Sequence, residues 1–103
     1  MAKNFKLLYS PLFYTDLDRI TDYILHELKN EGAALALIND VEAAIKQRLA
    51  NPLQTAMYQS LAERENPYRR ILVGNYLIFY VVIGDIMIVR RMLYGRRDME
   101  RIL

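Results

Sequence analysis

The chain has 103 residues, no cysteine and a formal net charge of +2. This length suits one domain with its own core, and without cysteine neither a disulfide framework nor a thiolate metal site can stabilise it. Residues 76–84 form the longest uncharged apolar run, about half of what a membrane-spanning helix needs, and the first residues lack the apolar stretch of a signal peptide. We therefore predict a single cytoplasmic domain over residues 1–103, with no membrane segment.

Basic residues are divided unevenly along the chain. Residues 1–51 hold six Lys and Arg against seven Asp and Glu, and residues 52–103 hold eight against five. All four lysines lie in the first half, so every cation in the second half is an arginine. Because the planar guanidinium suits phosphate and carboxylate recognition, the second half indicates a polyanionic partner. Arginines that point outward merely to solvate strands would give the same pattern.

The first half predicts a short strand and two helices. Residues 5–9 alternate as in a strand, and Ser10-Pro11 favours a helix start. The helix that follows has an apolar stripe at spacings of three or four: Phe13, Leu17, Ile20, Ile24 and Leu28. Its acidic residues are expected to face water: Asp16, Asp18, Asp22 and Glu27. Residues 30–32 break this helix, and a second one is predicted from 33 to 50, forming an antiparallel hairpin with the first; its buried stripe is Leu37, Ile38, Val41, Ile45 and Leu49.

The second half predicts a loop over residues 53–67, with a helical turn near 58–64, and then three strands. Runs rich in β-branched and aromatic residues at 68–73, 76–83 and 86–94 are separated by Gly74-Asn75 and Gly84-Asp85, which suit two-residue hairpin loops. The alternating run in the middle strand is expected in the core: Leu77, Phe79, Val81 and Ile83. Residues 95–103 are expected to form a short tail.

The predicted fold class is therefore α+β, in the order β-α-α-β-β-β, with an antiparallel sheet, a helical hairpin packed on one face and the other face open to a partner. On these elements stand the motifs YRR at residues 68–70, GNYLIFY at 74–80 and RMLYGRRD at 91–98. Together they resemble the RelE/ParE superfamily of type II toxin–antitoxin toxins. The resemblance spans nearly the whole chain.

The resemblance implies one of two activities on the same fold, since RelE-like members cleave mRNA in the ribosomal A site and ParE-like members inhibit DNA gyrase. It also implies a cognate antitoxin, whose disordered segment folds across the helical hairpin or the sheet in a toxin–antitoxin hetero-oligomer. A third alternative is a member that has lost toxicity and serves only to bind the antitoxin or assemble a repressor.

The residues themselves weigh against a nuclease. Cleavage through the RNA 2′-hydroxyl needs a proton acceptor, and arginine supplies only positive charge. His26 is the one histidine, lies on the first helix and is expected at the surface, so Tyr94 is the remaining proton relay, unless it only packs. Of the nuclease positions that the resemblance implies, Arg97 and Arg69 match, or Arg70 in place of Arg69 if the alignment shifts by one residue, whereas three others are apolar here: Ile71, Leu77 and Leu103. A ParE-like toxin is therefore favoured, although a histidine is common in that family where this chain has Tyr94.

The predicted partner-binding residues are Arg69, Arg70, Arg91, Tyr94, Arg96 and Arg97; if the chain is a nuclease, its catalytic candidates are Arg69, Arg97 and Tyr94. Arg69 and Arg70 point to opposite faces of one strand, so only one of them can face the open side, and the same holds for Arg90 and Arg91. Arg91 matches the strand arginine of the family, with an ion pair that pins the sheet as the alternative. No cofactor is expected, and no metal, because no element carries His, Asp or Glu at ligand spacing.

Overall fold

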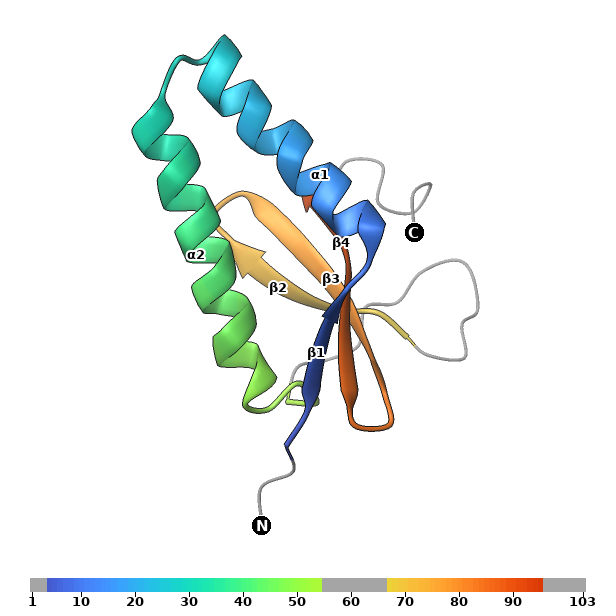
Figure 1. The fold of residues 1–103 in the computed structure, drawn as a ribbon. Helices are drawn as coiled ribbons and strands as arrows, with labels where there is room; N and C mark the ends of the chain where they lie inside the picture. The colour runs from blue at the N-terminus through green and yellow to red at the C-terminus, as the bar shows by residue number, and fades with distance from the viewer. Residues whose placement is uncertain (1–3, 55–66, 96–103) are drawn as a thin grey trace.

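A computed structural model describes residues 4–54 and 67–95 of the chain. It contains, in chain order, β1 (Lys6–Tyr9), α1 (Pro11–Asp22), a π-helical turn η1 (Tyr23–Glu27), α2 (Glu31–Leu49), β2 (Arg69–Val73), β3 (Tyr76–Ile83) and β4 (Ile86–Tyr94). The predicted fold class and element order are thus confirmed (Figure 1). The helical turn expected near residues 58–64 and the tail from residue 96 lie outside the described residues.

The sheet has four strands in the order β1-β4-β3-β2. The last three strands form the predicted antiparallel meander, and Gly74 and Gly84 open their turns at φ 58° and 61°, where a side chain is disfavoured. β1 differs from the prediction because it joins β4 in parallel, with Leu7 opposite Met87. The sheet is therefore mixed. A strand of four residues carries no sequence signal for the direction of its partner.

Both helices lie over one face of the sheet, α1 against β4 and α2 against β2 (Figure 1). The side chains between helices and sheet form the main core: Phe13, Val41, Ile45, Ile71, Val73, Ile78, Tyr80, Met87, Val89 and Met92. The apolar faces of the amphipathic helices and the inward-facing side chains of the strands pack together in this layer. No helix in the described part of the chain is both long and apolar enough to cross a membrane.

The opposite face of the sheet carries a second, smaller cluster of Leu77, Phe79 and Leu93, against which Tyr68 packs. Leu77, Phe79 and Val81 are buried, as predicted for the middle strand, whereas Ile83 at its end is exposed. The middle of β3 is therefore buried on both faces. This closes the centre of the face that the sequence predicted to be open.

The π-helical turn changes the register at the end of the first helix. The Leu28 amide donates to the Tyr23 carbonyl at 3.2 Å, five residues back, so the turn is wider than an α-helical one. Leu28, predicted to be buried, is consequently rotated outward and exposed. Lys29 then takes φ 50°, and Asn30 caps α2 by accepting from the Ala33 amide at 3.0 Å, so that α2 begins two residues before its predicted start.

Candidate functional site

The outer edge of β4 is paired first by β1 and then by the start of α1. After β1 ends, the Ser10 amide donates to the Val89 carbonyl at 2.9 Å, and the Ser10 hydroxyl donates to the Arg90 carbonyl at 2.8 Å. Further along α1, Asp16 accepts through Oδ2 from the Met92 amide at 3.0 Å. Ser10, which precedes α1, and Asp16 within α1 therefore satisfy backbone groups of β4 that β1 does not pair.

Asp16 also holds Arg91. Arg91 donates through Nε to Oδ2 at 2.7 Å and through Nη2 to Oδ1 at 3.0 Å, a two-point contact. Arg19 adds a longer bond to Oδ1 at 3.3 Å. The hydrogen bond with Asp16 raises the pKa of Arg91 above its usual value, although partial burial opposes this. Arg91 thus forms an ion pair, which is the alternative role predicted for it.

The prediction that Asp16 faces water was wrong, since Asp16 is only 3 % exposed. Its position three residues after Phe13 and four before Ile20 places it on the apolar stripe rather than opposite it. The signal was therefore present in the spacing, and the charge of the residue concealed it. A carboxylate is tolerated there because a strand edge and an arginine supply its hydrogen bonds.

A second polar cluster fixes the segment that follows α2. Tyr80 is fully buried in β3, and its hydroxyl donates to the Pro52 carbonyl at 2.6 Å. Arg48, near the end of α2, donates through Nη1 to the Tyr80 hydroxyl at 3.2 Å and to the Arg70 carbonyl at 3.0 Å. The cluster joins α2, the segment after it, and strands β2 and β3.

Arg69 and Arg70 are separated by the faces of β2, as predicted. Arg69 lies opposite Tyr80, on the helix-covered face, and donates to the Leu53 carbonyl at 3.3 Å. Arg70 lies opposite Phe79, on the other face, and is exposed. Because residues directly opposite on neighbouring strands share a face, Arg70 is the arginine of this pair on the side away from the helices.

Arg70 and Arg91 belong to one row across the sheet, since both lie opposite Phe79. Two strand spacings separate their α-carbons, about 10 Å. The contact between the Tyr68 and Phe79 rings, 6.1 Å between centroids, borders the same row. The structure therefore brings together Arg70 and Arg91, with aromatic rings between them, although the Arg91 guanidinium reaches round the edge of β4 to Asp16.

Arg69 and Tyr94 do not converge. Tyr94 lies opposite Tyr76, whereas Arg69 lies opposite Tyr80, four residues further along β3. Four strand residues and two strand spacings put their α-carbons roughly 16 Å apart. Arg96 and Arg97 lie outside the described residues. Of the three nuclease candidates, the two that the structure describes are therefore not near neighbours.

Tyr94 instead lines an aromatic cleft where α1 and η1 pass over the end of the sheet. This tyrosine cleft, about 700 Å³ in volume, is lined by Arg19, Ile20, Tyr23, Ile24, Leu28, Asn75, Tyr76 and Tyr94. The Tyr76 and Tyr94 rings meet edge to face at 5.3 Å. Burial, with smaller effects from Tyr94 and Tyr23, raises the pKa of Tyr76 above its usual value. Tyr23 and Tyr76 were not predicted as site residues, because they become neighbours only through the long-range packing of the helix on the sheet.

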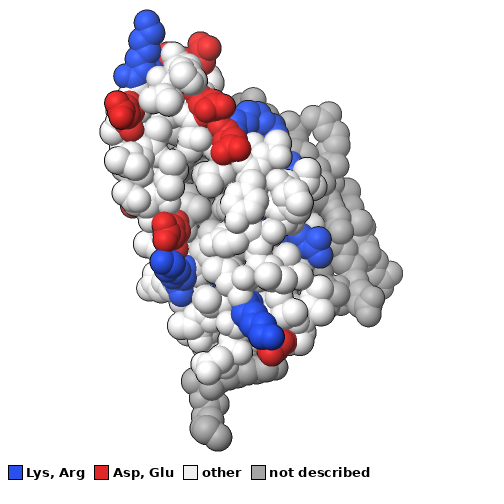
Figure 2. Space-filling model, in the orientation of Figure 1, with Lys and Arg blue, Asp and Glu red and all other residues white. Residues whose placement is uncertain are grey.

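The remaining candidates are at the surface or at an irregular position. His26 is exposed on η1, as expected. Arg90 is half-buried at a bulge in β4, where the register shifts between Phe79 and Tyr80. No group of three His, Asp or Glu among residues 4–54 and 67–95 could hold a metal ion. On the face shown in Figure 2, Lys and Arg are scattered singly among acids rather than gathered in a basic patch.

Comparison with known proteins adds a family and two similar folds. Residues 7–99 match the family described as ParE toxin of type II toxin-antitoxin system, parDE. The chromosomal ParDE TA system from P. aeruginosa has a chain with TM-score 0.72 and 19 % identity, covering 90 % of this chain and 98 % of its own. The RelB-RelE antitoxin-toxin complex from Methanococcus jannaschii gives TM-score 0.50 and 26 % identity, with 93 % and 98 % covered. No curated protein matches by sequence.

Proposed function

Since the chain belongs to the ParE toxin family of type II toxin–antitoxin systems, we propose that it inhibits DNA gyrase by binding to it, and that a cognate antitoxin neutralises it. The proposal makes the chain a binding protein without chemistry of its own. The family match supports it together with the geometry of the candidate catalytic residues.

The observation that carries this proposal is that Arg91 and Asp16 are hydrogen-bonded to each other. Arg91 is the arginine that matches the family's strand position, and both of its contacting nitrogens are bonded to Asp16. Both oxygens of Asp16 already accept hydrogen bonds, which makes this carboxylate a poor general base. The other proton-transfer candidate, Tyr94, lies on the opposite face of the sheet from the row of Arg70 and Arg91. The proton-transfer candidate named from the sequence therefore does not lie beside the positive charge of this row.

A supercoiling assay tests the gyrase proposal. The purified chain, free of antitoxin, is expected to inhibit supercoiling by gyrase from its own source, and addition of the antitoxin should restore activity. The exposed Arg70 provides the variant: Arg70→Ala should weaken inhibition about tenfold, as for one contact residue of an interface, whereas Lys6→Ala, an exposed cation on β1, should leave it unchanged. Undiminished supercoiling with the unaltered chain would overturn the proposal.

A RelE-like nuclease is the second candidate, because Arg70 and Arg91 share one row on the same face. It predicts cuts at codon positions in ribosome-bound mRNA, and their loss on Arg97→Ala with the fold intact. Intact message excludes it. Unchanged growth on induction without antitoxin would favour the third alternative, a chain that has lost toxicity.

A further inference from the structure

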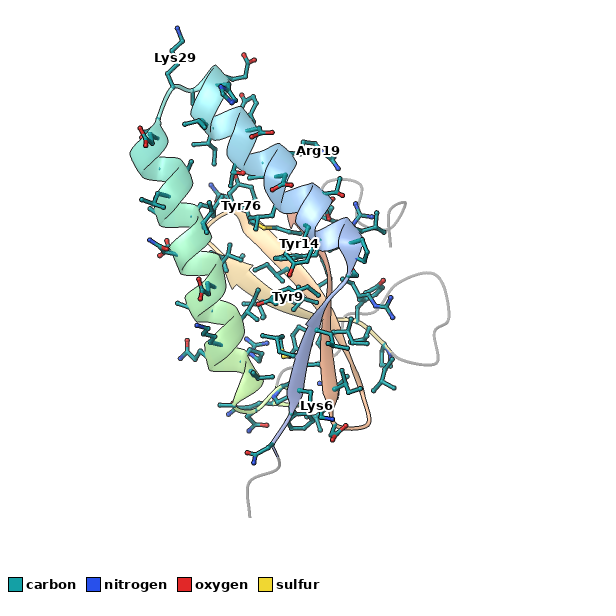
Figure 3. The ribbon with its side chains drawn as sticks, viewed as in Figure 1. Lys6, Tyr9, Tyr14, Arg19, Lys29 and Tyr76 are labelled. Carbon is teal, nitrogen blue, oxygen red and sulfur yellow. The ribbon has the colours of Figure 1, made fainter. Side chains whose placement is uncertain are left out.

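The two walls of the tyrosine cleft are formed by elements whose backbone is held in place by hydrogen bonds. Its helical wall is the π-helical turn η1, which begins at Tyr23 and places Tyr23 and Ile24 over the end of the sheet. Its sheet wall is closed by the Gly95 amide, which donates to the Asn75 carbonyl at 2.7 Å and ties the end of β4 to the β2–β3 turn. Figure 3 labels Arg19 on α1 and Tyr76 on β3, two of the residues that contribute to this site. π-helical turns often occur at functional sites.

The lining combines an apolar wall with few, distinct polar groups. Ile20, Ile24 and Leu28 supply aliphatic surface, and three phenol rings supply aromatic surface with hydroxyl donors. Arg19 is the one charged lining residue among those described. Its side chain is 72 % exposed, and Asp16 engages its Nη2 at 3.3 Å, which holds the guanidinium near the rim. The volume of about 700 Å³ is ample for one or two large side chains of a partner.

The charges decide which kind of group fits. Three tyrosines alone would suit an organic cation through cation–π contacts, but the Arg19 guanidinium repels a cation and favours a carboxylate. A polyanion such as nucleic acid is disfavoured, because the exposed ionisable groups on the same helical segment include three acids: Asp18, Asp22 and Glu27. The other exposed ionisable side chains of residues 11–29 are Tyr14, Arg19, Tyr23, His26 and Lys29. A group with an apolar body and a single negative charge therefore matches the cleft best.

We propose that the tyrosine cleft is a docking site for the antitoxin, and that the antitoxin inserts an apolar, preferably aromatic, side chain there beside one carboxylate. The proposal rests on the toxin function proposed above, from which it takes its partner. Tyr94, 59 % exposed, and Tyr76 form the aromatic contact, and Arg19 pairs with the carboxylate. The apolar contact gives affinity and the guanidinium selects the charge.

Three matched small molecules test the chemistry of the cleft on the full chain: 3-phenylpropionate, its neutral amide, and 3-phenylpropylammonium. Titration followed by backbone NMR should shift the amides of Ile24, Asn75 and Tyr76, with the anion binding at least about fivefold more tightly than the amide and the cation most weakly. Arg19→Gln should remove the preference for the anion while the amide still binds. Absence of shifts at the cleft, or tightest binding of the cation, would overturn the proposal.

The antitoxin encoded beside the chain tests the partner. Tyr94→Ala should raise its dissociation constant about tenfold or more, whereas Leu53→Ala, a matched variant in the segment after α2, outside the helical hairpin and the sheet, where the native residue is 52 % exposed, should change it less than about twofold. Circular dichroism checks that both variants fold. Equal dissociation constants for the two variants would refute docking in the cleft. A chain that binds antitoxin through the cleft but leaves gyrase active would refute only the gyrase proposal.

Discussion

Asp16 is the residue on which the helix and the sheet depend together, because it accepts hydrogen bonds from Arg91, Arg19 and the Met92 amide. Asp16→Asn keeps an acceptor for the amide but removes the charge opposite Arg91. We expect the free energy of unfolding to fall by about 3 kcal/mol, the size usual for breaking a buried pair. Urea denaturation measures it. The control Asp18→Asn, an exposed neighbour on α1, should change stability by less than about 0.5 kcal/mol, and similar losses in both variants would contradict this role.

Tyr80 links α2 and the segment after it to the sheet, as Asp16 links α1 to the sheet. Its hydroxyl is buried, donates to the Pro52 carbonyl and accepts from Arg48. Tyr80→Phe leaves the ring in place but strips both groups of a partner, so the free energy of unfolding should fall by about 1–3 kcal/mol. Tyr14→Phe, at an exposed tyrosine of α1, is the matched control and should be nearly neutral. Equal denaturation midpoints for the unaltered chain and Tyr80→Phe would show that the cluster contributes nothing.

At the scale of elements, replacing glycine by alanine should have opposite effects on stability in the β2–β3 turn and at the start of α2. Gly74 has φ 58° with open space around its missing Cβ, so Gly74→Ala meets only the backbone cost of about 1–2 kcal/mol. Gly32 lies in the first turn of α2, where an added Cβ would be 3.7 Å from the Asn30 side chain, an ordinary contact. Gly32→Ala should therefore stabilise the chain by about 0.4–1 kcal/mol. The midpoint temperature of thermal unfolding should fall for Gly74→Ala and rise for Gly32→Ala. A change of the same sign in both variants would contradict this prediction.

The elements also show why the sequence predicted some features and missed others. Helix periods and hairpin dipeptides are local, so α1, α2 and the β2-β3-β4 meander could be predicted from Phe13, Ile45 or Gly84 and their neighbours. The parallel pairing of Leu7 with Met87 joins residues 80 positions apart, and no local pattern encodes it. The row of Arg70 and Arg91 likewise depends on strand register, and the tyrosine cleft depends on how a π-helical turn rotates Tyr23.

For the whole molecule, stability should fall at alkaline pH. Partial burial raises the pKa of both Tyr9 and Tyr76 above the usual value of 10.0. A group whose pKa is higher in the folded than in the unfolded chain contributes stability that is fully present below the unfolded pKa and is lost as pH rises through the folded pKa. The free energy of unfolding should therefore be level with respect to these two phenols up to about pH 9 and decline beyond about pH 10.

Urea denaturation between pH 8 and pH 11 measures this decline, and the double variant Tyr9→Phe with Tyr76→Phe should flatten it, because phenylalanine has no proton to lose. The two tyrosines lie in different parts of the fold, Tyr9 in the groove between the helices and Tyr76 in the tyrosine cleft. Their contributions should consequently add, each single variant removing part of the loss. An equally steep decline in the double variant would assign alkaline destabilisation to other groups and contradict the burial of these two phenols as its cause.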